Sequence, residues 1–207
     1  MAVVSYEVVK DALRVAYRAK ADQRDNMDDQ PWKQSERERF LERMRRDGVS
    51  SLLEIGAGHG VSGRYFADEG LAVTCVDLSP ELVERCRDKG LDARVMDFGE
   101  LGFDAGAFDA VFGMNCLLHV PRSELSSIVA ELRRVLAPGG LFYWGQYGGR
   151  DFEGVYEHDD YDPKRFFSFL TAEGIQRVAS EGFEILDFTE TPINGDDFTY
   201  QALTLKA

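Results

Sequence analysis

The chain has 207 residues, of which 44% are hydrophobic and 29% are charged, a composition typical of globular proteins and not of disordered or fibrous ones. This length fits a single domain. Asp and Glu number 37 against 24 Lys and Arg, and the resulting net charge of −13 argues against nucleic acid or an anionic membrane surface as a partner.

The first 47 residues predict a helical arm. Apolar residues recur at helical spacing from Val3 to Tyr17 and again from Phe40 to Met44, on either side of a polar turn at residues 25–31. We therefore divide the chain into an N-terminal arm or cap, residues 1–47, and a domain over residues 48–207.

After Gly48 the pattern alternates between strands and helices. Short apolar runs predict strands at 51–55, 72–76, 93–96, 108–112 and 141–144. Helical patterns lie at 61–69, from 80 to a stop at 90, and at 123–136, and Pro138 to Gly140 predicts a turn before the fifth strand. Strands that alternate with helices indicate a parallel sheet.

The end of the chain departs from this alternation. A helix at 171–181 is followed by strands at 183–188 and 198–205, and the few residues between these strands suit an antiparallel hairpin. The expected fold is α/β, a doubly wound, Rossmann-like sheet of seven strands, mostly parallel with an antiparallel last strand. Residues 148–168 are too long for an ordinary connection and are interpreted as a lid insertion.

A glycine loop follows the first strand of the domain. Gly56, Gly58 and Gly60 lie between this strand and a helix, where backbone can approach a nucleotide or nucleoside. A dinucleotide site needs G-x-G-x-x-G, but its third glycine is Val61 here. Glu54 would also oppose a pyrophosphate, whereas it suits a cationic ligand.

The segment from Glu54 to Gly60 resembles the E/D-x-G-x-G-x-G motif of the class I S-adenosylmethionine-dependent methyltransferases of small-molecule type. Further motifs extend the resemblance over residues 51–146. It implies S-adenosyl-L-methionine as cofactor, S-adenosyl-L-homocysteine as product, and methyl transfer by in-line displacement. The motif implies that Glu54, Gly56, Ala57 and Gly58 contact the amino-acid end of the cofactor.

The same resemblance assigns other cofactor contacts. Asp77, in Asp77-Leu78 after the second strand, is similar to the acidic residue that binds both ribose hydroxyls, and Asp97-Phe98 looks like the adenine pocket. The implied contacts also include Leu78, Asn115 in the motif after strand four, and Tyr17, which resembles a tyrosine whose hydroxyl reaches the cofactor carboxylate.

The acceptor is expected to be a small molecule with an oxygen, nitrogen or carbon nucleophile. His119 follows strand four at the expected cleft and is the candidate general base, with loop packing as its alternative role. Six acids and several aromatic residues of the lid, Phe152, Tyr156, Tyr161, Phe166 and Phe167, favour a neutral or cationic acceptor in an apolar pocket.

The cysteines and the N-terminal residues indicate the cellular compartment in which the protein is expected. Cys75, Cys86 and Cys116 form neither a C-x-x-C pair nor an even set, so neither disulfides nor a metal site are expected. No leader pattern or run of 18 apolar residues is present. We expect a cytoplasmic monomer or homodimer without a membrane or nucleic acid partner.

Two other functions remain open from the sequence. An NAD(P)-dependent oxidoreductase can use a related sheet, and a non-catalytic module can keep this fold while binding only a cofactor or a partner. The missing third glycine argues against the first. The intact set Gly56, Gly58, Asp77 and Asp97 argues against the second.

Overall fold

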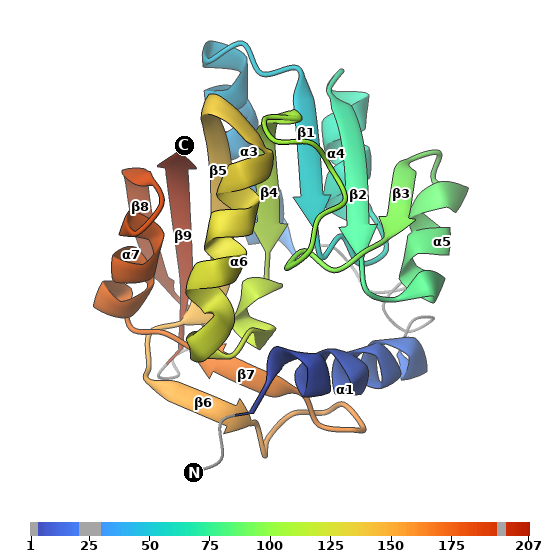
Figure 1. Ribbon diagram of the computed structural model, residues 1–207, viewed down its shortest axis with the longest axis vertical. Coiled ribbons are helices and arrows are strands. Elements are labelled where there is room, and N and C mark those ends of the chain that lie inside the picture. Colours follow the sequence, from blue (N-terminus) through green and yellow to red (C-terminus); the bar gives the residue numbers. More distant parts are fainter. Residues whose placement is uncertain (1–3, 21–29, 194–197) are drawn as a thin grey trace.

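A seven-stranded sheet forms the centre of the molecule in the computed structural model, which describes residues 4–20, 30–193 and 198–207. Its strand order is β3-β2-β1-β4-β5-β9-β8 (Figure 1). The strands are β1 (Ser51–Ile55), β2 (Ala72–Asp77), β3 (Asp92–Val95), β4 (Phe108–Met114), β5 (Leu136–Gly148), β8 (Glu184–Pro192) and β9 (Thr199–Lys206). Strands β1 to β5 pair in parallel and β9 is antiparallel to both neighbours, so the predicted fold class is confirmed.

Helices cover both faces of this sheet and one of its edges. The described helices are α1 (Tyr6–Ala19), α3 (Pro31–Arg46), α4 (Val61–Asp68), α5 (Pro80–Asp88), the 3-10 turn η1 (Leu117–His119), α6 (Arg122–Val135) and α7 (Ala172–Ser180). One face packs on α3 and α4 through Phe40 and Phe66, and α5 extends that layer at β2 and β3. The other face packs on α6 and α7 through Leu132 and Ile175. None of the described helices is long and apolar enough to cross a membrane.

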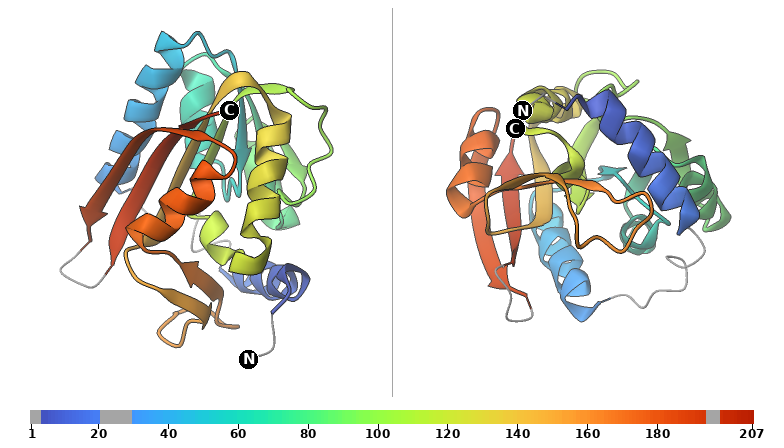
Figure 2. Two further views of the ribbon diagram at one scale, coloured as in Figure 1. Left: turned by 60° about the vertical axis from the view of Figure 1, so that its left-hand side comes forward. Right: turned by 90° about the horizontal axis from the view of Figure 1, so that it is seen from below.

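The order of the strands determines where a ligand can bind. The chain runs from β1 outward to β3, and then returns to β4 on the other side of β1. In a doubly wound sheet, such a reversal opens a crevice at the carboxyl ends of the strands. Helix α1 crosses this edge of the sheet (Figures 1 and 2). A separate hairpin, β6 (Phe152–Val155) and β7 (Phe166–Phe169), lies at the same edge.

The fold differs from the sequence prediction in two places. Strand β5 begins at Leu136 and includes Pro138 to Gly140, which were predicted as a turn; an irregular register opposite Phe108 accommodates them within the strand. The β6–β7 hairpin, inside the predicted lid, was not predicted as strands. Part of the predicted polar turn at residues 25–31, and residues 194–197 between β8 and β9, lie outside the described residues.

Candidate functional site

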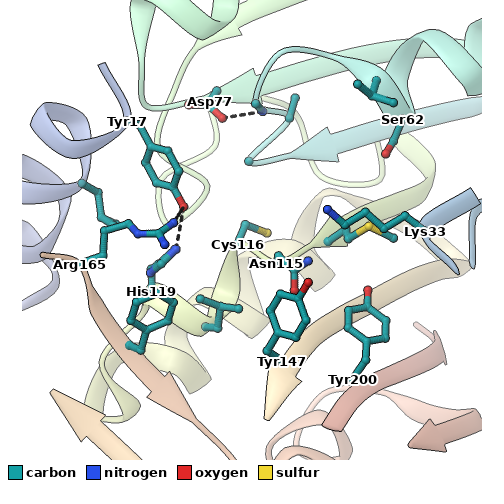
Figure 3. Close-up of a pocket in the computed structure, with 18 of the residues that line it drawn as sticks. Tyr17, Lys33, Ser62, Asp77, Asn115, Cys116, His119, Tyr147, Arg165 and Tyr200 are labelled. Atoms are coloured by element: carbon teal, nitrogen blue, oxygen red, sulfur yellow. Dashed lines mark hydrogen bonds between the residues drawn. The ribbon is translucent and has the colours of Figure 1, made fainter. Parts of the chain in front are cut away.

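A cavity of about 900 Å³ lies at the carboxyl edge of the sheet. Its walls come from α1, α3, the glycine loop, the segments after β2 and β4, the β6–β7 hairpin, and strands β5 and β9 (Figure 3). The cavity therefore joins the first part of the chain to the last. Its two ends differ in chemistry, and we call them the loop end, around Gly56 to Gly60, and the aromatic end, around Trp32 and Tyr200.

The glycine loop has a backbone that other residues adopt only with strain. Gly56, Gly58 and Gly60 have φ values of 58°, 57° and 81°. A Cβ atom at Gly56 would also lie 2.4 Å from the Cβ of Cys116, in the segment after β4. The loop thus packs directly against the segment that begins the 3-10 turn, and Gly56 allows this close approach.

Asp77 ends β2 and connects two parts of the loop end. One carboxylate oxygen accepts from the backbone N–H of Gly58 at 2.8 Å, and the other from the N–H of Ser79 at 2.9 Å. Its side chain lines the cavity beside this loop (Figure 3). Because each carboxylate oxygen can accept more than one hydrogen bond, Asp77 can also accept from hydroxyl groups of a ligand.

Glu54 is a buried carboxyl group in the wall of the cavity. Burial raises its pKa to about 8, although the Cys75 thiol, the Gly63 N–H and the charge of Arg37 act in the opposite direction. Arg37 is itself buried and lines the cavity from α3. A neutral Glu54 would ionise readily once a cation came near, because the attraction would offset the loss of hydration.

The predicted adenine residues are in two different environments. Phe98 lines the cavity, and its ring stacks on Tyr6 with centroids 6.0 Å apart. Asp97 is not part of the described cavity wall; its carboxylate accepts from Lys10 Nζ at 2.6 Å and from the Gly99 N–H at 2.8 Å. The prediction that Asp97 binds adenine therefore depends on a ligand atom that reaches beyond the described cavity wall.

Buried polar atoms without a hydrogen-bond partner among the described residues occur in the cavity wall. Asn115 Oδ1 and the Tyr6 hydroxyl are examples. Asn115 also has a φ of 57°, which is rare outside glycine and is held here by its N–H bond to the Gly145 carbonyl. Unpaired buried polar atoms are costly, so this wall fits a polar ligand that supplies the missing partners.

His119 lies in a hydrogen-bonded group at the rim of the cavity. Its Nδ1 lies 2.7 Å from the Phe166 carbonyl, which can only accept, so Nδ1 carries the proton. Its Nε2 lies 2.8 Å from the Tyr17 hydroxyl, which therefore donates to it when the ring is neutral. Arg165 donates to the same hydroxyl at 3.1 Å and forms an ion pair with Asp159 (Figure 3).

The aromatic end of the cavity combines residues from distant parts of the chain. Trp32 packs on Tyr200 with ring centroids 4.4 Å apart and on Tyr147 at 6.0 Å. Of the lid aromatics proposed for the pocket, Tyr156 and Phe167 line it, while Phe152, Tyr161 and Phe166 are not part of its described wall. Lys33 also lines this end (Figure 3), so the charge around the acceptor depends on this lysine as well as on the acidic residues of the lid.

Sequence reasoning missed several residues of the cavity wall: Tyr6, Trp32, Lys33, Glu36, Arg37, Tyr147 and Tyr200. Trp32 could have been suspected, because it is a large aromatic ring among the polar residues at the start of α3, whereas Arg37 is one of several arginines on that helix. Tyr147 and Tyr200 carry no motif, and only the pairing of β5 with β9 brings them together. All three cysteines are free thiols, and the described residues contain no His, Cys, Asp and Glu cluster suited to a metal ion.

Comparison with known proteins agrees with this geometry. Residues 53–144 match the family model of a methyltransferase domain. This match, over less than half of the chain, supports a class I S-adenosylmethionine-dependent methyltransferase. The chain aligns at 37% identity over 99 residues, 44% of its length, with a ubiquinone biosynthesis O-methyltransferase of Xanthomonas oryzae, of which it covers 41%. It is also 37% identical over 131 residues to a sarcosine/dimethylglycine N-methyltransferase of Halorhodospira halochloris, covering 56% of this chain and 46% of that protein.

The solved structures extend the likeness of fold to the whole chain. The 1,6-didemethyltoxoflavin-N1-methyltransferase of Burkholderia thailandensis, solved with bound 1,6-didemethyltoxoflavin and S-adenosylhomocysteine, superposes with a TM-score of 0.75 at 20% identity, over 100% of this chain and 92% of that one. The chain spans less than half the length of the two curated relatives named above. The likeness over the whole chain therefore covers the fold, and the acceptor named for each relative is a property of that relative.

Proposed function

We propose that this protein transfers a methyl group from S-adenosylmethionine to a small planar molecule. The observation that carries the proposal is one cavity with two unlike ends: a polar end at the glycine loop and an end walled largely by aromatic rings. Such a cavity suits two ligands whose reacting atoms meet where the ends join. When bound, the cofactor supplies an activated methyl group, and the protein aligns the acceptor and excludes water.

The loop end has the groups that a zwitterionic nucleoside needs. Asp77 is proposed to accept from the ribose hydroxyls, and Leu78 and Phe98 to flank the nucleoside. Gly56, Ala57 and Gly58 allow the amino-acid end to approach the backbone. These roles rest on the position of each residue in the cavity wall and on its place in the motif.

The amino-acid end requires partners for both of its charges. Glu54 is proposed to pair with the ammonium group, because a carboxyl with a raised pKa gains most from an incoming cation. Arg37 is proposed as the partner of the carboxylate, and Asn115 Oδ1 as a further acceptor for the ammonium. Tyr17, also on the wall, is proposed as a neighbour of this end of the cofactor.

We assign His119 a positioning role in place of the general base suggested by the sequence. Both ring nitrogens already have partners, and the Tyr17 hydroxyl lies on Nε2, the nitrogen that would accept a proton. His119 thus connects α1 to Phe166 of β7, which lies within the lid at residues 148–168. The arm over 1–47 and this lid are proposed to close the cavity around the ligands.

The acceptor is proposed to be a flat ring system, neutral overall or bearing a polarised O–H or N–H group. Trp32, Tyr147, Phe167 and Tyr200 supply flat apolar walls, and such walls stack favourably on planar rings. The relatives include, by name, an O-, an N- and a C-methyltransferase, so the nucleophile stays open among oxygen, nitrogen and carbon.

Calorimetric titration tests the cofactor and separates it from the alternatives. S-adenosylmethionine and S-adenosylhomocysteine should bind, and NADH should not. Binding of NADH alone would favour an oxidoreductase. Binding of S-adenosylhomocysteine without methyl transfer to any member of a library of aromatic hydroxyl and amino compounds would favour a non-catalytic module.

A further inference from the structure

A chain of three hydroxyl and carboxyl groups reaches the aromatic end of the cavity. The Tyr143 hydroxyl donates to Glu36 Oε2 at 2.7 Å, and it lies 3.1 Å from the Tyr200 hydroxyl. Glu36 and Tyr200 both line the cavity, whereas Tyr143 lies buried behind them on β5. The three residues come from α3, β5 and β9, so the chain exists only in the folded protein.

The carboxylate gives this chain a direction. A carboxylate accepts hydrogen bonds and does not donate them, so the Tyr143 proton points to Glu36. The Tyr143 oxygen then accepts from Tyr200, and the Tyr200 proton points away from the cavity. The oxygen lone pairs of Tyr200 consequently remain available to a donor on a ligand, and Figure 3 shows this hydroxyl directed into the cavity.

A glycine in mid-strand makes room for the chain. A Cβ atom at Gly145 would lie 2.1 Å from the Tyr200 hydroxyl oxygen and 2.7 Å from that of Tyr143. The Gly145 carbonyl accepts from the Asn115 N–H at 2.7 Å, and the next residue, Cys116, touches Gly56 of the glycine loop. Tyr200, the last residue of this hydrogen-bond chain, therefore lies near the place where the loop end and the aromatic end of the cavity meet.

We infer that the Tyr200–Tyr143–Glu36 chain takes the proton from an O–H group of the methyl acceptor, an inference that rests on the proposed function. As the acceptor oxygen bonds to the methyl carbon, the bond from that carbon to sulfur breaks. The acceptor proton moves to the Tyr200 oxygen, the Tyr200 proton to Tyr143, and the Tyr143 proton to Glu36. The sulfonium charge is neutralised as sulfur keeps the bonding electrons, and Glu36 becomes a carboxylic acid.

The surroundings of the chain favour a relay over a phenolate base. Burial raises the pKa of both Tyr143 and Tyr200 well above the usual range, so both stay protonated between turnovers. Glu36 is the group that finally holds the proton. Its side chain keeps some exposure to water and pairs with Arg39 on the next turn of α3, which gives the proton a route to solvent.

The first test measures binding, without turnover. The protein saturated with S-adenosylhomocysteine is titrated with 4-nitrophenol, and the absorbance of the coloured anion gives the apparent pKa of the bound probe. In the native chain Tyr200 accepts from the neutral phenol and favours it over the anion. In Glu36→Gln the side-chain amide can donate to the Tyr143 oxygen, so that Tyr143 donates to Tyr200 and Tyr200 donates to the probe. The bound probe should then favour its anion about tenfold more than in the native protein.

Two variants separate this effect from simple loss of a charge. Tyr200→Phe keeps the Glu36 charge but removes the acceptor, and it should shift the probe in the same direction as Glu36→Gln. Glu38→Gln removes a charge from the exposed side of the same helix and should leave the probe unchanged. Tyr143→Phe breaks the hydrogen-bond chain at its middle residue. This variant is used in the same test if Tyr200→Phe melts at a much lower temperature than the native protein.

The second test measures turnover with phenols of different acidity. Glu36→Gln and Tyr200→Phe should lower kcat for 4-methoxyphenol by about 10²-fold, the scale for loss of proton transfer, and should change it little for 4-nitrophenol, which is readily ionised. The inference is overturned if these variants behave like Glu38→Gln in both tests, or if no phenol binds to the S-adenosylhomocysteine complex. Failure to bind S-adenosylhomocysteine would instead overturn the proposed function.

Discussion

The two ends of the cavity are built in opposite ways. The centre of the loop end comes from short segments that follow strands β1 and β2, and Asp77 bonds to Gly58 only 19 positions away. The aromatic end joins Trp32 to Tyr200, and Glu36 to Tyr143 across 107 positions. Backbone groups dominate the first end and side chains the second.

This difference separates what the family shares from what one member can vary. Backbone donors and glycines cannot be changed without altering the loop, whereas an aromatic side chain can be exchanged within an intact sheet. We therefore expect changes at the loop end to weaken every reaction of the protein. Changes at the aromatic end should alter the choice of acceptor and leave the cofactor in place.

The largest effect is expected for Gly56→Ala. The new Cβ atom would overlap Cys116 and sit on a backbone with a φ of 58°, so S-adenosylhomocysteine affinity should fall by more than about 100-fold and unfolding free energy by about 2–4 kcal/mol. Gly48→Ala is the matched control, because Gly48 has a similar φ and open space around it. Equal losses in both variants would show that backbone strain alone matters.

Asp77→Ala should have the next largest effect. It removes a charged acceptor from two backbone N–H groups and from the proposed ribose contact, so calorimetry should show binding weaker by about 1.5–3 kcal/mol. Asp77→Asn keeps one acceptor oxygen and should recover part of this loss. Native affinity in Asp77→Ala would contradict the ribose assignment.

Glu54→Gln should remove a dependence of cofactor binding on pH. The pKa of Glu54 is about 8 in the folded protein, above its ordinary 4.5. Between about pH 4.5 and 8 the unfolded chain has released this proton and the folded protein has not, so the ligand-free protein loses stability as pH rises through this range. Pairing with an ammonium group favours the ionised form, so affinity should increase with pH up to about 8, by at most about tenfold per unit. Titrations and melting curves at several pH values check both slopes. Their persistence in Glu54→Gln would assign them to another group.

Trp32→Ala should affect the aromatic end alone. We expect an acceptor KM about tenfold higher, from the loss of a stacking wall, with S-adenosylhomocysteine affinity within about twofold of native. Trp32→Phe retains a ring and should restore most of the acceptor binding. A large loss of cofactor affinity in Trp32→Ala would show that the two ends are not separable.

The smallest change in catalysis is expected for His119→Ala. As a positioning residue, it should lower kcat by less than about tenfold and stability by about 1–3 kcal/mol, since two buried hydrogen bonds are lost. A general base would instead lower kcat by about 10²–10⁴-fold and leave a pH profile without the imidazole step. Measurement of kcat against pH in both proteins distinguishes these roles.

The same contrast explains how far the sequence could be interpreted. Apolar runs, caps and the glycine spacing predicted the parallel sheet and the loop end, because each depends on neighbours in the chain. The extension of β5 back to Leu136 was not predictable, since it depends on the pairing of Leu136 with Phe108 and on hydrogen bonds that link Gly139 and Gly140 to Ala207. Nor could the partners of His119 and Tyr143 be predicted, because they depend on how α1 and α3 lie against the sheet.

The position of α1 has a consequence for the speed of the proposed reaction. This helix crosses the carboxyl edge of the sheet and lines the cavity through Tyr6 and Tyr17. Three hydrogen bonds hold it there: the Tyr6 N–H to Glu124, Lys10 to Asp97, and the Tyr17 hydroxyl to His119. We expect a spent nucleoside bound beside this helix to leave faster when these bonds open. Departure of product, a motion of the arm, would then set the upper limit of kcat.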